Sequence, residues 1–94
     1  MPNCFLFVSK ETKTIVDLNK VDEEICGFLG IEVHPTNYAA GWFDCIGFRL
    51  AIGKTWDDME TEFAAQGNKW YDRQLKIVRF LRERYDSSAW YSPR

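Results

Sequence analysis

The chain has 94 residues, of which 46% are hydrophobic and 16% aromatic, and its formal net charge is −2. A chain of this length folds around one core, so it excludes a multi-domain enzyme and leaves little room for a deep active-site cavity. The apolar content excludes a disordered chain, because it supplies enough surface to bury. We therefore expect residues 1–94 to form a single compact domain, with residues 86–94 as a tail.

The N-terminal part contains two segments typical of β-strands. Residues 4–8 are apolar and rich in strand formers, and residues 14–16 form a β-branched run after the polar turn at residues 10–13. A two-stranded hairpin is only marginally stable in water, so it must pack against helices.

The first helix is expected at residues 20–29, with Asn19 as its N-cap and Gly30 after its last turn. Residues 31–33 are then an extended piece that enters a loop, because His34 precedes a proline and such a residue is pushed out of the helical region. A lone histidine on a loop is typical of a surface group and not of a catalyst.

A repeated phrase predicts the next three helices. Tryptophan followed within two residues by aspartate occurs at Trp42, Trp56 and Trp70, and an acidic residue in a first turn favours the positive end of the helix dipole. The second helix is expected from about Gly41 to Gly53, with Gly47 permitting close approach of another element.

The third and fourth helices have clear end signals. Thr55 is a strong N-cap for the third helix, and Gly67 closes it. Asn68 caps the fourth helix at residues 69–85, whose inward face is expected to include Trp70.

The fold class expected from these elements is α+β and mainly helical, with an N-terminal two-stranded β element packed on about four helices. The expected core consists of Phe5, Phe7, Ile15, Ile25, Trp42, Ile46, Leu50, Trp56, Phe63, Leu75, Val78 and Leu81.

The three cysteines, Cys4, Cys26 and Cys45, are odd in number and lack Cys-x-x-Cys spacing, and the chain begins without a signal-like segment. We expect a reduced, cytoplasmic protein whose cysteines are buried apolar groups. A zinc site with His34 lacks the usual close ligand pairing, so no metal and no cofactor are predicted.

Two further clusters resemble functional sites only superficially. The segment from Gly47 to Thr55 has five residues between its glycines where a phosphate-binding loop needs four, and it is an apolar helical stretch. Four acidic residues follow Thr55 without a histidine or a calcium-loop spacing, so they either solvate a helix start or face a basic partner. Because no catalytic grouping is visible, we do not expect an enzyme.

The charge divides unevenly along the chain. Residues 1–68 carry eleven acids and five bases, whereas residues 69–94 carry three acids and seven bases. On the fourth helix the cations surround Phe80, opposite the expected core face. Phe80 can be covered by the hairpin or by Trp90 and Tyr91, and the acidic third helix can neutralise the cations; otherwise this is a contact surface.

We predict that this surface binds a partner. Its residues are Arg73, Lys76, Arg79, Phe80, Arg84, Trp90 and Tyr91.

Three stretches, residues 22–26, 41–56 and 88–91, are similar to small open reading frames carried by tailed bacteriophages. The resemblance implies a compact protein in the host-cell cytoplasm that binds and redirects a host protein, such as a defence or regulatory complex. It implies no activity and no site residues.

The expected function is therefore non-enzymatic binding and inhibition or modulation of a host protein, with no membrane contact and with homodimerisation left open. The alternative is a nucleic-acid-binding accessory protein that uses the basic fourth helix.

Overall fold

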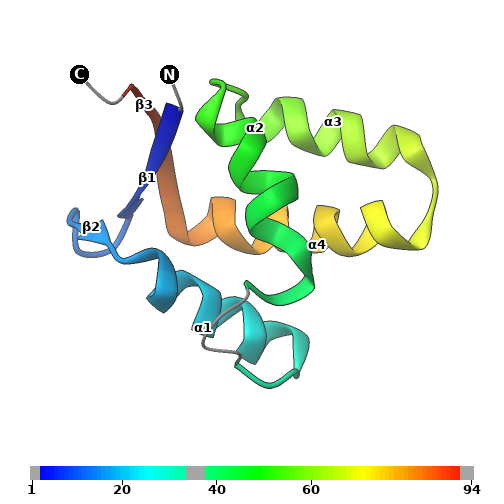
Figure 1. Cartoon of the computed structure of the whole chain (residues 1–94), viewed down its shortest axis with the longest axis horizontal. Coiled ribbons are helices and arrows are strands. Elements are labelled where there is room, and N and C mark those ends of the chain that lie inside the picture. The colour runs from blue at the N-terminus through cyan, green and yellow to red at the C-terminus, as the bar shows by residue number, and fades with distance from the viewer. Residues whose placement is uncertain (1–2, 34–37, 92–94) are drawn as a thin grey trace.

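The computed structural model of the chain describes the backbone of residues 3–33 and 38–91 and the side chains of residues 5–33 and 38–88. A three-stranded antiparallel sheet has the order β2-β1-β3. It is built from β1 (Asn3–Ser9), β2 (Ile15–Val16) and β3 (Tyr85–Tyr91). The helices gather on one side of this sheet, and α3 and α4 lie side by side as a long hairpin (Figure 1).

The helical part comprises α1 (Leu18–Leu29), a 3₁₀ turn (Ala39–Gly41), a π-helix (Phe43–Gly47), α2 (Phe48–Ala51), α3 (Trp56–Gln66) and α4 (Lys69–Arg84). The predicted class, a mainly helical α+β fold, is confirmed.

The sheet has one strand more than the sequence predicted. Residues 85–91, expected as the last helical residue and a tail, form β3, which pairs antiparallel with all of β1 from Ser9 opposite Tyr85 to Asn3 opposite Tyr91. The helix therefore ends at Arg84. A three-stranded sheet with an apolar face is more stable than the marginal hairpin.

The N-cap of α1 is Asp17, not Asn19. The Asp17 carboxylate accepts a hydrogen bond of 2.7 Å from the backbone N–H of Asn19, so the helix begins two residues earlier than expected. Gly30 closes α1 in the left-handed conformation, as predicted.

The predicted ends of α3 and the start of α4 are confirmed. Thr55 and Asp58 form a capping box, Gly67 is left-handed after α3, and the Asn68 side chain accepts from the N–H of Tyr71. These contacts satisfy the orphan donors of the first turns, which explains why both helices could be located from the sequence.

The second helix is not the continuous helix that the sequence predicted. Residues 39–51 form the 3₁₀ turn, the π-helix and one turn of α-helix in succession. The backbone is left-handed at Ala40 (φ 57°) and Gly41 (φ 67°), just before the π-helix. A regular helix cannot include such residues, so the helical backbone begins at Trp42, next to the predicted start at about Gly41. The π turn that follows is what the sequence did not predict.

Ten of the twelve predicted core residues are buried. Ile15 is the clear error: it is 66% exposed in the two-residue strand β2. Trp56 is half-buried and stacks on Phe7 with ring centroids 6.0 Å apart. Cys26 and Cys45 are buried free thiols, as expected.

Candidate functional site

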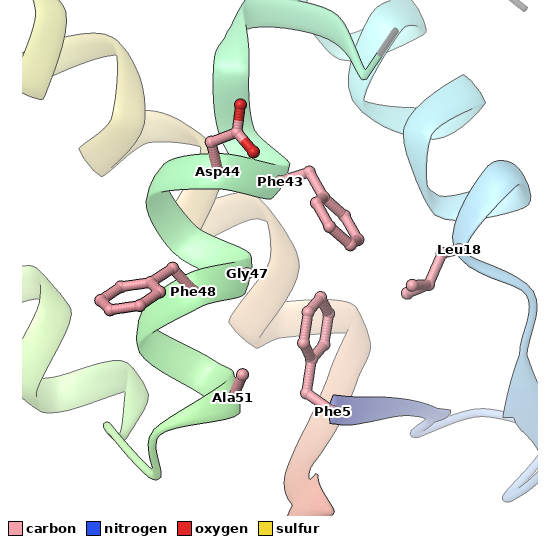
Figure 2. Close-up of a pocket in the computed structure, with 7 residues that line it drawn as sticks. All are labelled: Phe5, Leu18, Phe43, Asp44, Gly47, Phe48 and Ala51. Carbon is pink, nitrogen blue, oxygen red and sulfur yellow. The ribbon is translucent and has the colours of Figure 1, made fainter. Parts of the chain in front are cut away.

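An apolar pocket of about 330 Å³ lies between β1, the first turn of α1 and the helical segment at residues 43–51 (Figure 2). Its volume is at the small end of the range for ligand sites. The residues that line it are Phe5, Leu18, Phe43, Asp44, Gly47, Phe48 and Ala51. We refer to it as the apolar pocket.

Three of the lining side chains come from distant parts of the chain and converge. Figure 2 shows Phe5, Leu18 and Phe43 turned toward one another, whereas Phe48 points away on the other side of its helix. The rings of Phe5 and Phe43 are tilted by 46° with centroids 5.6 Å apart. These walls can surround an apolar group that enters from solvent.

Gly47 allows the Phe5 ring to lie against the helix backbone. A Cβ atom at this position would lie 2.9 Å from Cζ of Phe5, closer than real side chains approach. The prediction that Gly47 permits close approach of another element is therefore confirmed.

The π-helix sets the direction of the lining residues. The N–H of Phe48 donates to the carbonyl of Phe43, five residues earlier. Single π turns within helices occur frequently at functional sites. Arg49 supports this turn, because its Nη1 donates to the carbonyl of Cys45 at 2.9 Å while its other nitrogens hold Glu62.

Buried polar contacts hold the strained entry to the π-helix. One oxygen of Asp22, which is 4% exposed, accepts from the N–H of Ala39 and from Nε1 of Trp42, both at 2.8 Å. Gln74 lies on α4 and donates from Nε2 to the carbonyl of Ala40 at 2.6 Å. A left-handed alanine costs about 1–2 kcal/mol, and these hydrogen bonds offset that cost and hold the turn in place.

Trp70 packs beside this turn and not in the core. It is 47% exposed, which corrects the prediction that it lies on the inward face of the fourth helix. A Cβ at Gly41 would lie 2.6 Å from Cη2 of Trp70. The glycine thus gives the indole room, and its positive φ favours glycine as well.

The charge at the apolar pocket comes from Asp44, an exposed residue of the π-helix. The other six lining residues are apolar or glycine. Such a pocket suits an apolar group that carries a cation beside it.

The predicted partner surface on α4 is partly neutralised by α3. Nε of Arg79 lies 3.1 Å from Oε1 of Glu60. Arg82 pairs with Glu60 and, at 2.9 Å, with Asp57. The acidic and basic helices therefore lie against each other, which was one of the alternatives from the sequence. Arg73 and Lys76 are exposed.

Phe80 packs against α1, a contact that the sequence did not suggest. Its ring stacks on Phe28 with centroids 4.5 Å apart, and the Arg84 guanidinium lies 4.5 Å from its centroid. The backbones of Trp90 and Tyr91 belong to β3, while their side chains lie outside the described residues.

A second, polar cleft of about 430 Å³ contains Tyr85 and Glu24. The Tyr85 hydroxyl donates to Oε1 of Glu24 at 2.5 Å. Burial, followed by this hydrogen bond, raises the pKa of Tyr85. A phenol held in this way is a structural link between α1 and β3 and a poor proton donor to a substrate.

The two described thiols have little chemical reactivity. Burial raises the pKa of Cys26 and of Cys45, so both thiols are protonated at neutral pH. In the part of the chain that the structure describes, no three His, Cys, Asp or Glu side chains are grouped to hold a metal ion. The other two zinc candidates, His34 and the side chain of Cys4, lie outside that part.

Among residues 3–33 and 38–91, no helix has both the length and the apolar composition needed to cross a membrane.

Sequence reasoning predicted none of the residues of the apolar pocket as site residues, although it placed Phe5 in the core and expected a close approach at Gly47. The available signals were Gly47 inside an apolar run and Phe43 beside Trp42. They could not reveal the site, because the pocket exists only where β1 packs against the segment at residues 43–51.

No protein-family model, curated protein or solved structure matches the chain, so its function must be argued from this geometry.

Proposed function

We propose that the chain is a non-enzymatic binding domain that recognises another protein through the apolar pocket. The observation that carries the proposal is an apolar pocket walled by Phe5, Leu18 and Phe43, with the Asp44 carboxylate as its charged group. Interface hot spots are apolar or aromatic anchors that enter such pockets.

The helix that forms one wall of the pocket carries two exposed apolar groups on its other side. Phe48 is 60% exposed and Ile52 is 50% exposed. They are four positions apart along one helical turn, so they lie on the same side of it. Large exposed apolar groups close to a pocket are typical of interaction sites.

The partner chemistry follows from the lining. An apolar side chain would fill the pocket, and a lysine or arginine close to it would meet Asp44. The phage-like resemblance extends the proposal to a host protein as the target, with inhibition or redirection of that protein as the consequence.

Nucleic-acid binding through α4 is the weaker proposal. Arg79 and Arg82 are engaged by carboxylates of α3, and Phe80 is stacked on Phe28. Less cationic and aromatic surface is left for phosphates and bases than the sequence suggested.

A pull-down from nuclease-treated bacterial lysate, read by mass spectrometry, tests the proposal. Ala51→Arg fills the pocket with a charged chain, and Phe48→Asp removes an exposed ring at little cost to folding. The matched control is Val33→Asp, an exposed apolar residue (51%) that does not line the pocket. Circular dichroism confirms that each variant is folded.

We expect a discrete protein that wild type and Val33→Asp retain and that both pocket variants lose. The proposal would be overturned if Ala51→Arg and Phe48→Asp still retained this protein and an Arg73→Glu/Lys76→Glu variant lost it. Recovery that depends on intact nucleic acid would also overturn the proposal and would favour the alternative.

A further inference from the structure

We infer that the partner binds as an extended segment that adds to the open edge of β1 and inserts one side chain into the apolar pocket. This inference rests on the proposed function and specifies how the same site recognises its partner. Strand addition draws its affinity from main-chain hydrogen bonds and its specificity from pockets for alternate side chains.

Half of β1 lacks a neighbour on one side. β3 pairs with the whole strand, but β2 pairs only with Phe7 and Val8. Within the described chain, residues 3–6 therefore have no strand beside them at the edge where β2 lies. Such an edge is a template for another chain.

The sequence itself stops β2 from covering this edge. Asp17 follows Val16 directly and caps α1, accepting from the N–H of Asn19. The chain thus turns out of the sheet and into the helix. Leu18, the first helical residue, then lines the pocket next to the open edge.

The main-chain groups of Phe5 point toward this open edge. The N–H of Ser9 donates to Thr14 on the side of β2, whereas the N–H of Lys10 donates to Arg84 on the side of β3. Successive residues of an antiparallel strand alternate between their two neighbours. Phe5, four residues before Ser9, therefore faces the side of β2, and within the described residues no hydrogen bond outside the sheet engages its main chain.

The pairing places a side chain of the added strand in the pocket. Residues directly opposite each other in neighbouring antiparallel strands share one face of the sheet. Phe5 has its ring in the pocket wall, so the residue opposite it points into the same space, beside Phe43 and Leu18. A leucine, methionine or phenylalanine suits this apolar site.

Asp44 adds a charge requirement. Side chains two positions apart in a strand lie on the same face, so a lysine or arginine two residues from the apolar anchor stays on the pocket side, where the Asp44 carboxylate lies. The inferred ligand is therefore an extended peptide with an apolar anchor and a cation at this alternate spacing.

The test uses peptides from a displayed random nonapeptide library, selected on the wild-type chain and counter-selected on Ala51→Arg. Each backbone amide of the best peptide is then N-methylated in turn, which removes one donor and leaves every side chain unchanged. Methylation at neighbouring positions serves as a matched control, because adjacent amides of a strand point in opposite directions.

We expect an alternating pattern. Methylation at the amide that faces Phe5 should weaken binding by about tenfold or more, and methylation at its two neighbours should change binding by less than about threefold. Hydrogen exchange of the Phe5 amide, followed by NMR, should slow when the peptide binds.

Two results would overturn strand addition and leave the proposed function standing. One is a set of methylation effects that do not alternate along the peptide. The other is a complex in which the NMR signals of Gly47 and Ala51 shift but the Phe5 amide is not protected from exchange. A library that yields no peptide sensitive to Ala51→Arg would also overturn strand addition. The pull-down decides the proposed function independently.

Discussion

The α3–α4 hairpin and the segment at residues 38–51 are built in opposite ways. The hairpin follows local rules, with a capping box at Thr55, a left-handed Gly67 and an Asn68 cap. The segment breaks them with two left-handed residues and a π turn, and it is held by Asp22 and Gln74 from other helices.

The two regions also differ in what they leave on the surface. The hairpin pairs some of its own charges across α3 and α4, where Arg79 and Arg82 contact Asp57 and Glu60. The irregular segment provides most of the apolar pocket and the exposed ring of Phe48. Violations of local rules are expected where a chain is shaped for function.

The largest effect should come from the anchor of the irregular segment. Trp42 is fully buried and bonded to Asp22, so Trp42→Ala should lower the free energy of unfolding by about 3–5 kcal/mol. Trp70→Ala, at a half-exposed indole, should cost less than about 2 kcal/mol. Urea denaturation measures both, and equal losses would show that the segment is not held as described.

The second-largest loss of stability should come from a methyl group added at Gly47, where the Phe5 ring lies against the helix backbone. Gly47→Ala places a methyl group 2.9 Å from the Phe5 ring, which should cost about 1–3 kcal/mol. Gly27→Ala is the matched control, because a Cβ there meets nothing within 4 Å inside α1, and it should stabilise by about 0.5–1 kcal/mol. The same denaturation experiment should give opposite signs for the two variants.

The hairpin should respond to the loss of a local contact. Thr55→Ala removes half of the capping box and should cost about 1 kcal/mol. Thr61→Ala, at an exposed site inside α3, should be neutral or slightly stabilising. A thermal melt that ranks the two in the reverse order would contradict the assigned cap.

A smaller gain is expected where the irregular segment is strained. Ala40→Gly relieves a left-handed alanine and should raise the free energy of unfolding by about 0.5–1 kcal/mol. Ala39→Gly, next to it but without a positive φ, should lower it by a similar amount. Destabilisation by both substitutions would remove the argument for strain.

The smallest effect concerns pH. The hydrogen bond from Arg49 lowers the pKa of Glu62, so the unfolded chain binds a proton here more readily than the folded one. This stability is present above the unfolded pKa and is lost as pH falls through the lowered folded value. Since the pair is partly exposed, we expect at most about 1 kcal/mol. The measurement is the midpoint of urea denaturation as a function of pH. In Glu62→Gln this midpoint should fall less steeply at acid pH than in wild type.

What the sequence could predict is what local chemistry determines. The caps at Thr55 and Asn68 and ten of the twelve core residues follow from hydrogen-bonding side chains and periodicity close in the chain. Ile15 was placed wrongly because a β-branched run does not show which of its residues faces inward. Val16 lies opposite the buried Phe7, so Ile15, opposite Val8, points to the other face of the sheet.

The remaining features depend on contacts between distant residues. β3 forms because β1 offers it an edge, and the π-helix persists because Asp22, Trp70 and Gln74 hold the turn before it. The pocket also depends on contacts between distant residues, since its walls come from three separate segments. No local pattern in the chain specifies such an arrangement.

The central claim is that recognition occurs at the irregular segment and not at the basic helix. The most direct measurement is the affinity of the captured partner, by isothermal titration calorimetry, for wild type, Ala51→Arg and Arg73→Glu/Lys76→Glu. We predict a loss of more than about tenfold for Ala51→Arg and less than about threefold for the charge-reversed pair. A tight complex with Ala51→Arg and a large loss in the charge-reversed variant would contradict the claim.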